Sequence, residues 1–189
     1  DRVRKMITVK INGEERQYPQ GATYEDVAND YQQEYENLIA LAARDGKIRE
    51  LFKKLTRDCE VTFFTLKDDV GNKTYVRSAT MLFLKAVFDV YGREAAQSCR
   101  VEFAIGNGSY ISPKEKINAT EENPAKIRNQ MRELVEAKTP FLKRSYSLDN
   151  AMELFRKEGM KDKEKLFRYR RGSFVNIYEM DGYYDYYYG

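Results

Sequence analysis

The sequence predicts an α+β fold made of two domains, residues 1–67 and 68–189. Short β-branched runs surround a single amphipathic helix in the first part, whereas stretches with helical periodicity dominate the second. A polar turn is predicted over residues 67–72, around Gly71, and the two parts are expected to join near residues 68–75. Because 42% of the 189 residues are hydrophobic and 33% are charged, we expect a globular chain with a buried core.

Four strands and one helix are expected in the first domain. In order, these are strands over residues 5–11 and 14–18, a helix that begins after Thr23, and strands over 38–43 and 60–66. Asn12-Gly13 readily adopts the positive φ angles of a tight hairpin turn. Thr23 can cap the helix, and Asp26 suits its first turn. This order matches a β-grasp roll, in which a mixed sheet buries one face against a single helix.

Helices and a closing strand pair are expected in the second domain. Pro124 suits a first helical turn because its missing N–H would have no partner there, and Ser147 can cap a later helix. The expected elements are a helix from Ser78 to Gly92, a strand over 101–105, a turn at Gly106–Gly108 with a short strand near Tyr110, helices from Asn123-Pro124 to Pro140 and from Ser147 to Gly159, and strands over 173–180 and 183–188 joined at Asp181-Gly182.

The composition argues against several classes of function. No apolar run approaches the ~18–20 residues that span a bilayer, and the phosphate-binding pattern G-x-x-x-x-G-K-[ST] is absent. Without histidine, and with Cys59 and Cys99 far apart in the sequence, neither a zinc site nor a Ser-His or Cys-His couple is expected. We therefore expect a cytoplasmic protein with reduced thiols, no membrane contact, no metal site and no catalytic residues in this chain.

A basic and aromatic segment is the main candidate for binding. Residues 143–171 contain ten Lys or Arg against five Asp or Glu. The arginines could contact phosphates and the aromatic rings could stack on bases. The alternative is a solvated basic face with two core aromatic residues, which a salt-dependent RNA affinity would distinguish. The candidate residues are Arg168, Tyr169, Arg170, Arg171 and Phe174.

Two stretches of the chain resemble domains of threonyl-tRNA synthetases. Residues 6–66, with the opening ITVKINGEERQYPQGATYEDVA, resemble a TGS domain, the β-grasp module at the N-terminus of those enzymes. From Gly71 onward the chain resembles their next domain, which edits mischarged tRNA. There VRSATMLFLKAV stands where the family has R-H-S-x-x-H-L-L, and AIGNGSYIS stands where it has G-x-x-x-x-N-G-F-Y-Y-D.

The departures from the editing pattern bear on function. The two editing histidines map onto Arg77 and Met81, and a later C-x-G-x-H element would fall at Tyr187 and beyond. Because Arg, Met and Tyr cannot supply the same ligands or bases, hydrolytic editing is not expected. Arg77, Met81, Asp185 and Tyr187 are instead candidates for holding a ligand in the altered pocket. The alternative is that Arg77 is solvated and Met81 only fills space.

The same two-domain layout with altered histidines resembles the N-terminal region of bacterial uridine-kinase-like nucleoside kinases. This resemblance implies a non-catalytic accessory region that binds a nucleotide or RNA. The resemblance also implies a kinase domain that uses ATP and Mg²⁺, in cis after Gly189. Because the chain opens on Asp1 rather than Met and ends in an aromatic run, we expect it to be a fragment of a longer protein. The alternatives are a free-standing RNA-binding module related to tRNA recognition and an enzyme with a remodelled editing pocket.

Overall fold

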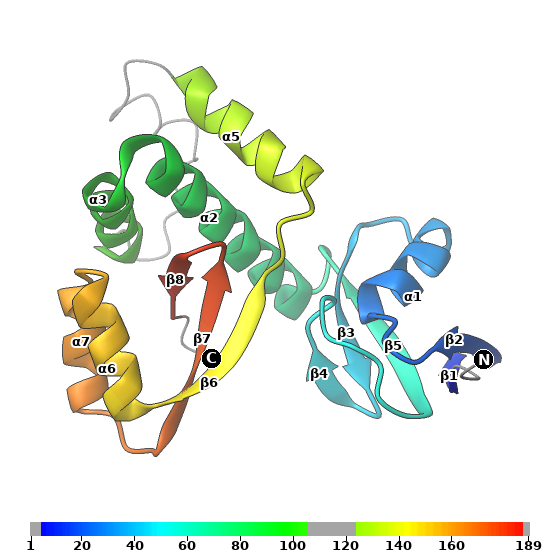
Figure 1. Ribbon diagram of the computed structural model, residues 1–189. Coiled ribbons are helices and arrows are strands. Elements are labelled where there is room, and N and C mark those ends of the chain that lie inside the picture. The colour runs from blue at the N-terminus through cyan, green and yellow to red at the C-terminus, as the bar shows by residue number, and fades with distance from the viewer. Residues whose placement is uncertain (1–4, 106–123, 187–189) are drawn as a thin grey trace. The chain divides into compact units, whose positions relative to one another are not determined.

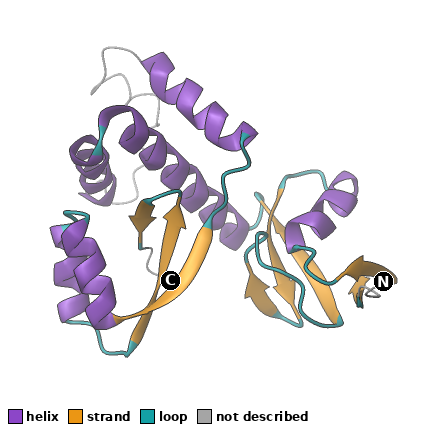
Figure 2. Cartoon of the chain, in the orientation of Figure 1, coloured by secondary structure: helices purple, strands orange, loops and turns teal. Residues whose placement is uncertain are grey.

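The computed structural model describes residues 5–105 and 124–186, including their side chains except at residues 101–105 and 124. The chain divides into two units, residues 1–78 and 79–189. The division lies inside a long helix, whereas the sequence predicts a join at residues 67 and 68. Both units combine helices with a sheet, which confirms the predicted α+β class (Figure 2).

The first unit contains a mixed five-stranded sheet with the strand order β2-β1-β5-β3-β4 (Figure 1). Strands β1 and β5 are parallel, and the other neighbours are antiparallel. The strands are β1 (Met6–Ile11), β2 (Glu14–Pro19), β3 (Ile39–Arg44), β4 (Lys47–Arg49) and β5 (Cys59–Thr65). Asn12 and Gly13 have φ angles of 51° and 83°, which confirms the predicted hairpin turn.

Helix α1 (Tyr24–Tyr31) packs on this sheet and continues into a short 3-10 turn, η1 (Gln32–Glu34). Thr23 and Asp26 form the predicted capping box, in which each side chain accepts a hydrogen bond from the other residue's backbone N–H. The apolar face of α1 is buried in one core with Ile7, Val9 and Val61 of the sheet. This arrangement matches the predicted roll of a mixed sheet on one helix.

The second unit contains a three-stranded antiparallel sheet with the order β6-β7-β8, surrounded by helices (Figure 1). Helix α2 begins in the first unit and enters the second. The elements are α2 (Asp69–Tyr91), α3 (Arg93–Ile105), α5 (Pro124–Glu136), β6 (Leu142–Ser147), α6 (Leu148–Lys157), α7 (Lys161–Arg168), β7 (Phe174–Met180) and β8 (Tyr183–Asp185).

Aromatic side chains fill the core of this unit. The rings of Phe155 in α6 and Phe167 in α7 lie 5.5 Å apart, and Phe167 lies 4.9 Å from the ring of Tyr186. Val175 and Ile177 of β7 are buried in the same core. The contacts of Phe167 therefore fix which side of α7 faces the core and which side faces solvent.

Three predictions are wrong: the helix start at Ser78, the polar turn around Gly71 and the strand over residues 101–105. Helix α2 begins at Asp69, so the stretch at Ser78 lies inside a helix and Ser78 does not cap it. The polar turn predicted around Gly71 is part of this helix. A Cβ at position 71 would collide with the backbone carbonyl of Thr65. The glycine therefore allows the helix to approach β5 closely. Residues 101–105 form the end of α3 rather than a strand, because the apolar run continues a helical pattern from Ala96 and Cys99.

Other predicted elements agree with the structure or lie outside it. The helix opened by Pro124, the helix capped by Ser147, and the strand pair around Asp181-Gly182 are confirmed. Strand β6 and helix α7 were not predicted. The predicted turn at Gly106–Gly108 and the strand near Tyr110 fall outside the described residues.

Candidate nucleic-acid interface

The segment from Arg168 to Phe174 joins α7 to β7 and is exposed along its whole length. The side chain of Tyr169 is 87% exposed, and that of Phe174 is 66% exposed. The alternative that these aromatic residues belong to the core therefore does not hold. The sequence-predicted residues Arg168, Arg170 and Arg171 lie in the same exposed segment, so the structure brings all five candidates together.

Helix α7 explains why this segment faces solvent. Within the helix only Phe167 is buried, at 1% exposure, so the residues on its other sides face away from the core. Tyr169 follows as the C-terminal cap residue, and the chain then turns back into β7. The strand begins at Phe174, whose neighbour Val175 is buried, so alternation along the strand places Phe174 on the opposite side.

The three arginines have different surroundings. The guanidinium of Arg168 donates to Glu164 at 3.2 Å, and Glu164 also accepts from Arg156 at 2.9 Å. These hydrogen bonds lower the pKa of Glu164 below its usual range, and the bond from Arg156 has the larger effect. The Arg170 guanidinium lies 5.3 Å from the centre of the Tyr186 ring. Within residues 5–105 and 124–186, no ion pair of Arg171 is found.

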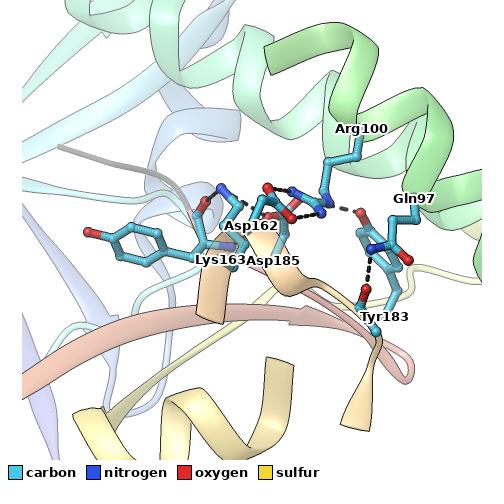
Figure 3. Close-up of polar contacts among 8 residues, drawn as sticks. Gln97, Arg100, Asp162, Lys163, Tyr183 and Asp185 are labelled. Atoms are coloured by element: carbon cyan, nitrogen blue, oxygen red, sulfur yellow. Dashed lines mark hydrogen bonds and ion pairs between the residues drawn. The ribbon is translucent and has the colours of Figure 1, made fainter. Parts of the chain in front are cut away.

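A charge cluster that is buried at Arg100 and Asp185 but exposed at Asp162 lies at the start of α7 (Figure 3). Arg100 of α3 donates through both terminal nitrogens to the carboxylate of Asp162, at 2.6 and 2.5 Å. Lys163 Nζ lies 3.7 Å from an oxygen of Asp185 and donates to the backbone carbonyl of Tyr186 at 2.7 Å. The other oxygen of Asp185 accepts from the Tyr183 hydroxyl at 3.3 Å. The cluster therefore links α3, α7 and β8.

Burial and neighbouring charges perturb the two carboxylates of this cluster in opposite directions. Burial raises the pKa of Asp185 to about 6, although the charges of Lys163 and Arg100 oppose this rise. Burial also acts to raise the pKa of Asp162, but its hydrogen bonds and ion pair with Arg100 outweigh burial and lower that pKa. Asp185 therefore changes protonation at a higher pH than an ordinary aspartate does.

The cluster supports the exposed segment rather than forming part of it. The Arg100–Asp162 pair holds the first turn of α7 against α3, and Gln97 donates to the carbonyl of Gly159, just before α7. These contacts, with the buried ring of Phe167, fix the helix from which the exposed segment extends. Within the described residues, no group of three or more His, Cys, Asp or Glu side chains is placed to hold a metal ion.

The residues predicted for an altered editing pocket occupy different surroundings. Arg77 is half-buried within α2, and Met81, one turn later, is 1% exposed and packs in the apolar core. The described contacts of Asp185 are those of the charge cluster. Tyr187 lies outside the described residues. The ligand pocket therefore remains a prediction.

The sequence predicts neither the charge cluster nor the neighbours of the exposed segment. The sequence places Arg100 in a loop before a predicted strand, and its partner Asp162 lies 62 residues away. Strand β6, which pairs with β7 throughout its length, was also missed. The alternation of side chains from Leu142 to Ser147 was the one local signal for it, and that alternation is weak because polar residues occupy both sides.

Comparisons with known proteins point to aminoacyl-tRNA synthetases. The chain is 28% identical over 184 residues to the threonine–tRNA ligase of Thermotoga maritima, an alignment that covers 90% of this chain and 28% of that protein. The threonine–tRNA ligases of Thermotoga neapolitana and Carboxydothermus hydrogenoformans are 26% and 25% identical and cover 92% and 91% of this chain. The chain spans 28% of the length of these relatives. No family model matches the sequence.

These similarities support a relation to threonyl-tRNA synthetase, and they favour the predicted alternative of a synthetase-derived module over the nucleoside-kinase interpretation. A TGS domain and a kinase parent both remain predictions. Among the helices of the described residues, none is long and apolar enough to cross a membrane.

Proposed function

We propose that this chain is a module related to threonyl-tRNA synthetase that binds tRNA through the Arg168–Phe174 segment and does not hydrolyse mischarged tRNA. The observation that carries the proposal is the exposure of Tyr169 and Phe174 among three arginines. Large exposed aromatic side chains are costly in a solvated surface, and their presence beside cations is typical of an interface for nucleic acid. The module would play this part whether or not a kinase domain using ATP and Mg²⁺ belongs to the same protein.

The chemistry of the segment suits RNA. Guanidinium groups can contact phosphates through paired hydrogen bonds, and such contacts position the nucleic acid. An exposed ring adds ~1–3 kcal/mol for each base that stacks on it. The Arg168 side chain is 60% exposed in its ion pair with Glu164, and such pairs contribute little to stability. Because Glu164 keeps its contact with Arg156, a phosphate can replace it as the partner of Arg168 at small cost.

The absence of hydrolysis follows from the residues of the chain. The sequence contains no histidine, and the positions that match the editing histidines hold Arg77 and Met81. A guanidinium does not accept a proton at neutral pH, and a thioether is not a base. We therefore expect no measurable deacylation of mischarged tRNA by this chain.

The affinity for tRNA at different salt concentrations tests the proposal. Three phosphate contacts give a slope of about −2.1 to −2.7 for log K against log salt, or about a 20- to 40-fold weakening from 50 to 200 mM. Fluorescence anisotropy with a labelled, uncharged tRNA measures this slope. No binding at low salt would refute the proposal.

Matched variants separate this segment from general basic charge. Replacing Arg170 and Arg171 with alanine together should reduce the magnitude of the slope by about 1.4 to 1.8, because two phosphate contacts are lost. The control replaces Arg128 and Arg132 with alanine together, which removes two exposed arginines from α5 in the same unit. If both variants change the slope equally, the charge of the whole unit rather than this segment carries binding.

A further inference from the structure

One side of strand β7 continues the exposed segment. Alternate residues of a strand point to the same side of the sheet, so Phe174, Asn176, Tyr178 and Met180 share a side. Exposure falls along this row: Phe174 is 66% exposed, Asn176 is exposed, Tyr178 is half-buried and Met180 is 2% exposed. The open part of this side therefore lies beside the Arg168–Phe174 segment.

Strand β6 adds polar and basic groups to the same side. Ser145 pairs with Asn176, and Lys143 pairs with Tyr178, and cross-strand partners project from the same face. Ser145 and Asn176 are both exposed, and Lys143 Nζ lies 5.5 Å from the centre of the Tyr178 ring. The result is a surface with an aromatic ring at each end and a polar pair between them.

We infer that this surface, the β6–β7 platform (Lys143, Ser145, Phe174, Asn176 and Tyr178), binds single-stranded RNA. The inference rests on the proposed function and names the form of RNA that the site takes. A ring can stack only on a base whose face is open, and in a duplex the faces are covered by neighbouring base pairs. The platform therefore requires unpaired nucleotides.

The spacing of the two rings supports a splayed strand. Phe174 and Tyr178 are four residues apart in β7, which corresponds to about 13 Å along a strand. Neighbouring bases within a stacked strand are only about 3.4 Å apart. Bases that contact both rings therefore come from a strand in which neighbouring bases are not stacked on one another. The Ser145 hydroxyl and Asn176 amide between the rings offer donors and acceptors for base edges.

Two oligonucleotides of equal length test the form of RNA. One is a labelled, unstructured single-stranded RNA, and the other is a labelled RNA hairpin with a short loop, both titrated at low salt by fluorescence anisotropy. We expect the single strand to bind about 10-fold more tightly. Phe174→Leu should weaken the single strand by about 10-fold and leave the hairpin unchanged, because only stacking is lost.

The control and the outcomes distinguish this inference from the proposed function. Tyr75→Leu removes a 47% exposed aromatic ring outside the platform and should change neither affinity. Because Phe174 is largely exposed, its leucine variant should fold, and circular dichroism checks this. Equal binding of both RNAs would overturn the platform, whereas a salt-dependent affinity for tRNA that is reduced by replacing Arg170 and Arg171 would still support the proposed function. Failure of both RNAs, and of tRNA, to bind at low salt would refute the proposed function itself.

Discussion

Replacing Asp185 with asparagine should change how stability depends on pH. In the folded chain the Asp185 carboxyl is 1% exposed, and burial raises its pKa to about 6 from an ordinary value of 3.8. Between these two pH values the folded state holds a proton that the unfolded state has released. Wild-type stability attributable to Asp185 is therefore fully present below pH 3.8 and is lost as pH rises through about 6.

The size of the effect follows from the two pKa values. Each unit of pKa corresponds to about 1.4 kcal/mol, so the change from 3.8 to about 6 amounts to about 3 kcal/mol. The asparagine side chain of the variant cannot titrate, so the other groups of the cluster contribute similarly to both proteins. The free energy of unfolding of the wild type minus that of Asp185→Asn should fall by about this amount between pH 4 and pH 7.

Urea unfolding at a series of pH values measures this difference. Far-UV circular dichroism follows the transitions, and hydrogen exchange in α7 and β7 assigns one of them to the second unit. Asp162→Asn is the matched control, because the pKa of Asp162 is lowered and its contribution is lost as pH falls. A difference for Asp185 that stays constant with pH would show that Lys163 and Arg100 balance burial, and one that grows with pH would show that they outweigh it.

Three further substitutions test local packing and capping within the two units, all by urea unfolding. Gly71→Ala should destabilise the chain because the alanine Cβ collides with the carbonyl of Thr65. This collision should outweigh the helix propensity of alanine, which is about 1 kcal/mol more favourable than that of glycine. A variant more stable than the wild type would contradict this contact. Thr23→Ala should cost about 1 kcal/mol through loss of the capping box, whereas Thr23→Ser should cost little; equal losses would count against the cap. Because Met81 is buried, Met81→Ala should lower the free energy of unfolding by about 2–5 kcal/mol, and Met81→Leu by less than about 1.5 kcal/mol. An alanine variant as stable as the wild type would exclude a packing role.

Features set by neighbouring residues could be predicted from the sequence. The capping box of Thr23 and Asp26 and the turn at Asn12-Gly13 depend on residues at most three positions apart, and the structure has both. The turn predicted around Gly71 is wrong because the role of this glycine is not set by its neighbours in the sequence. Its role depends on a contact with the end of β5, and a glycine that permits close approach has the same sequence signal as one that makes a turn.

The candidate site was only partly predictable for the same reason. The Arg168–Phe174 segment is visible as a run of arginines and aromatic residues, but whether the rings are buried depends on how Phe167 and Val175 pack. The platform requires β6 to pair with β7, and the charge cluster requires Arg100 to meet Asp162, 62 residues later. No local pattern specifies such long-range contacts.

Hydrogen exchange in the presence of tRNA tests the central claim most directly. With saturating tRNA at low salt, we expect slower exchange in peptides that cover residues 168–178, where the exposed segment continues into β7. Peptides from α5, which carries the control residues Arg128 and Arg132, should exchange at the same rate with and without tRNA. Protection confined to α5 or to the first unit, with residues 168–178 unchanged, would contradict the account.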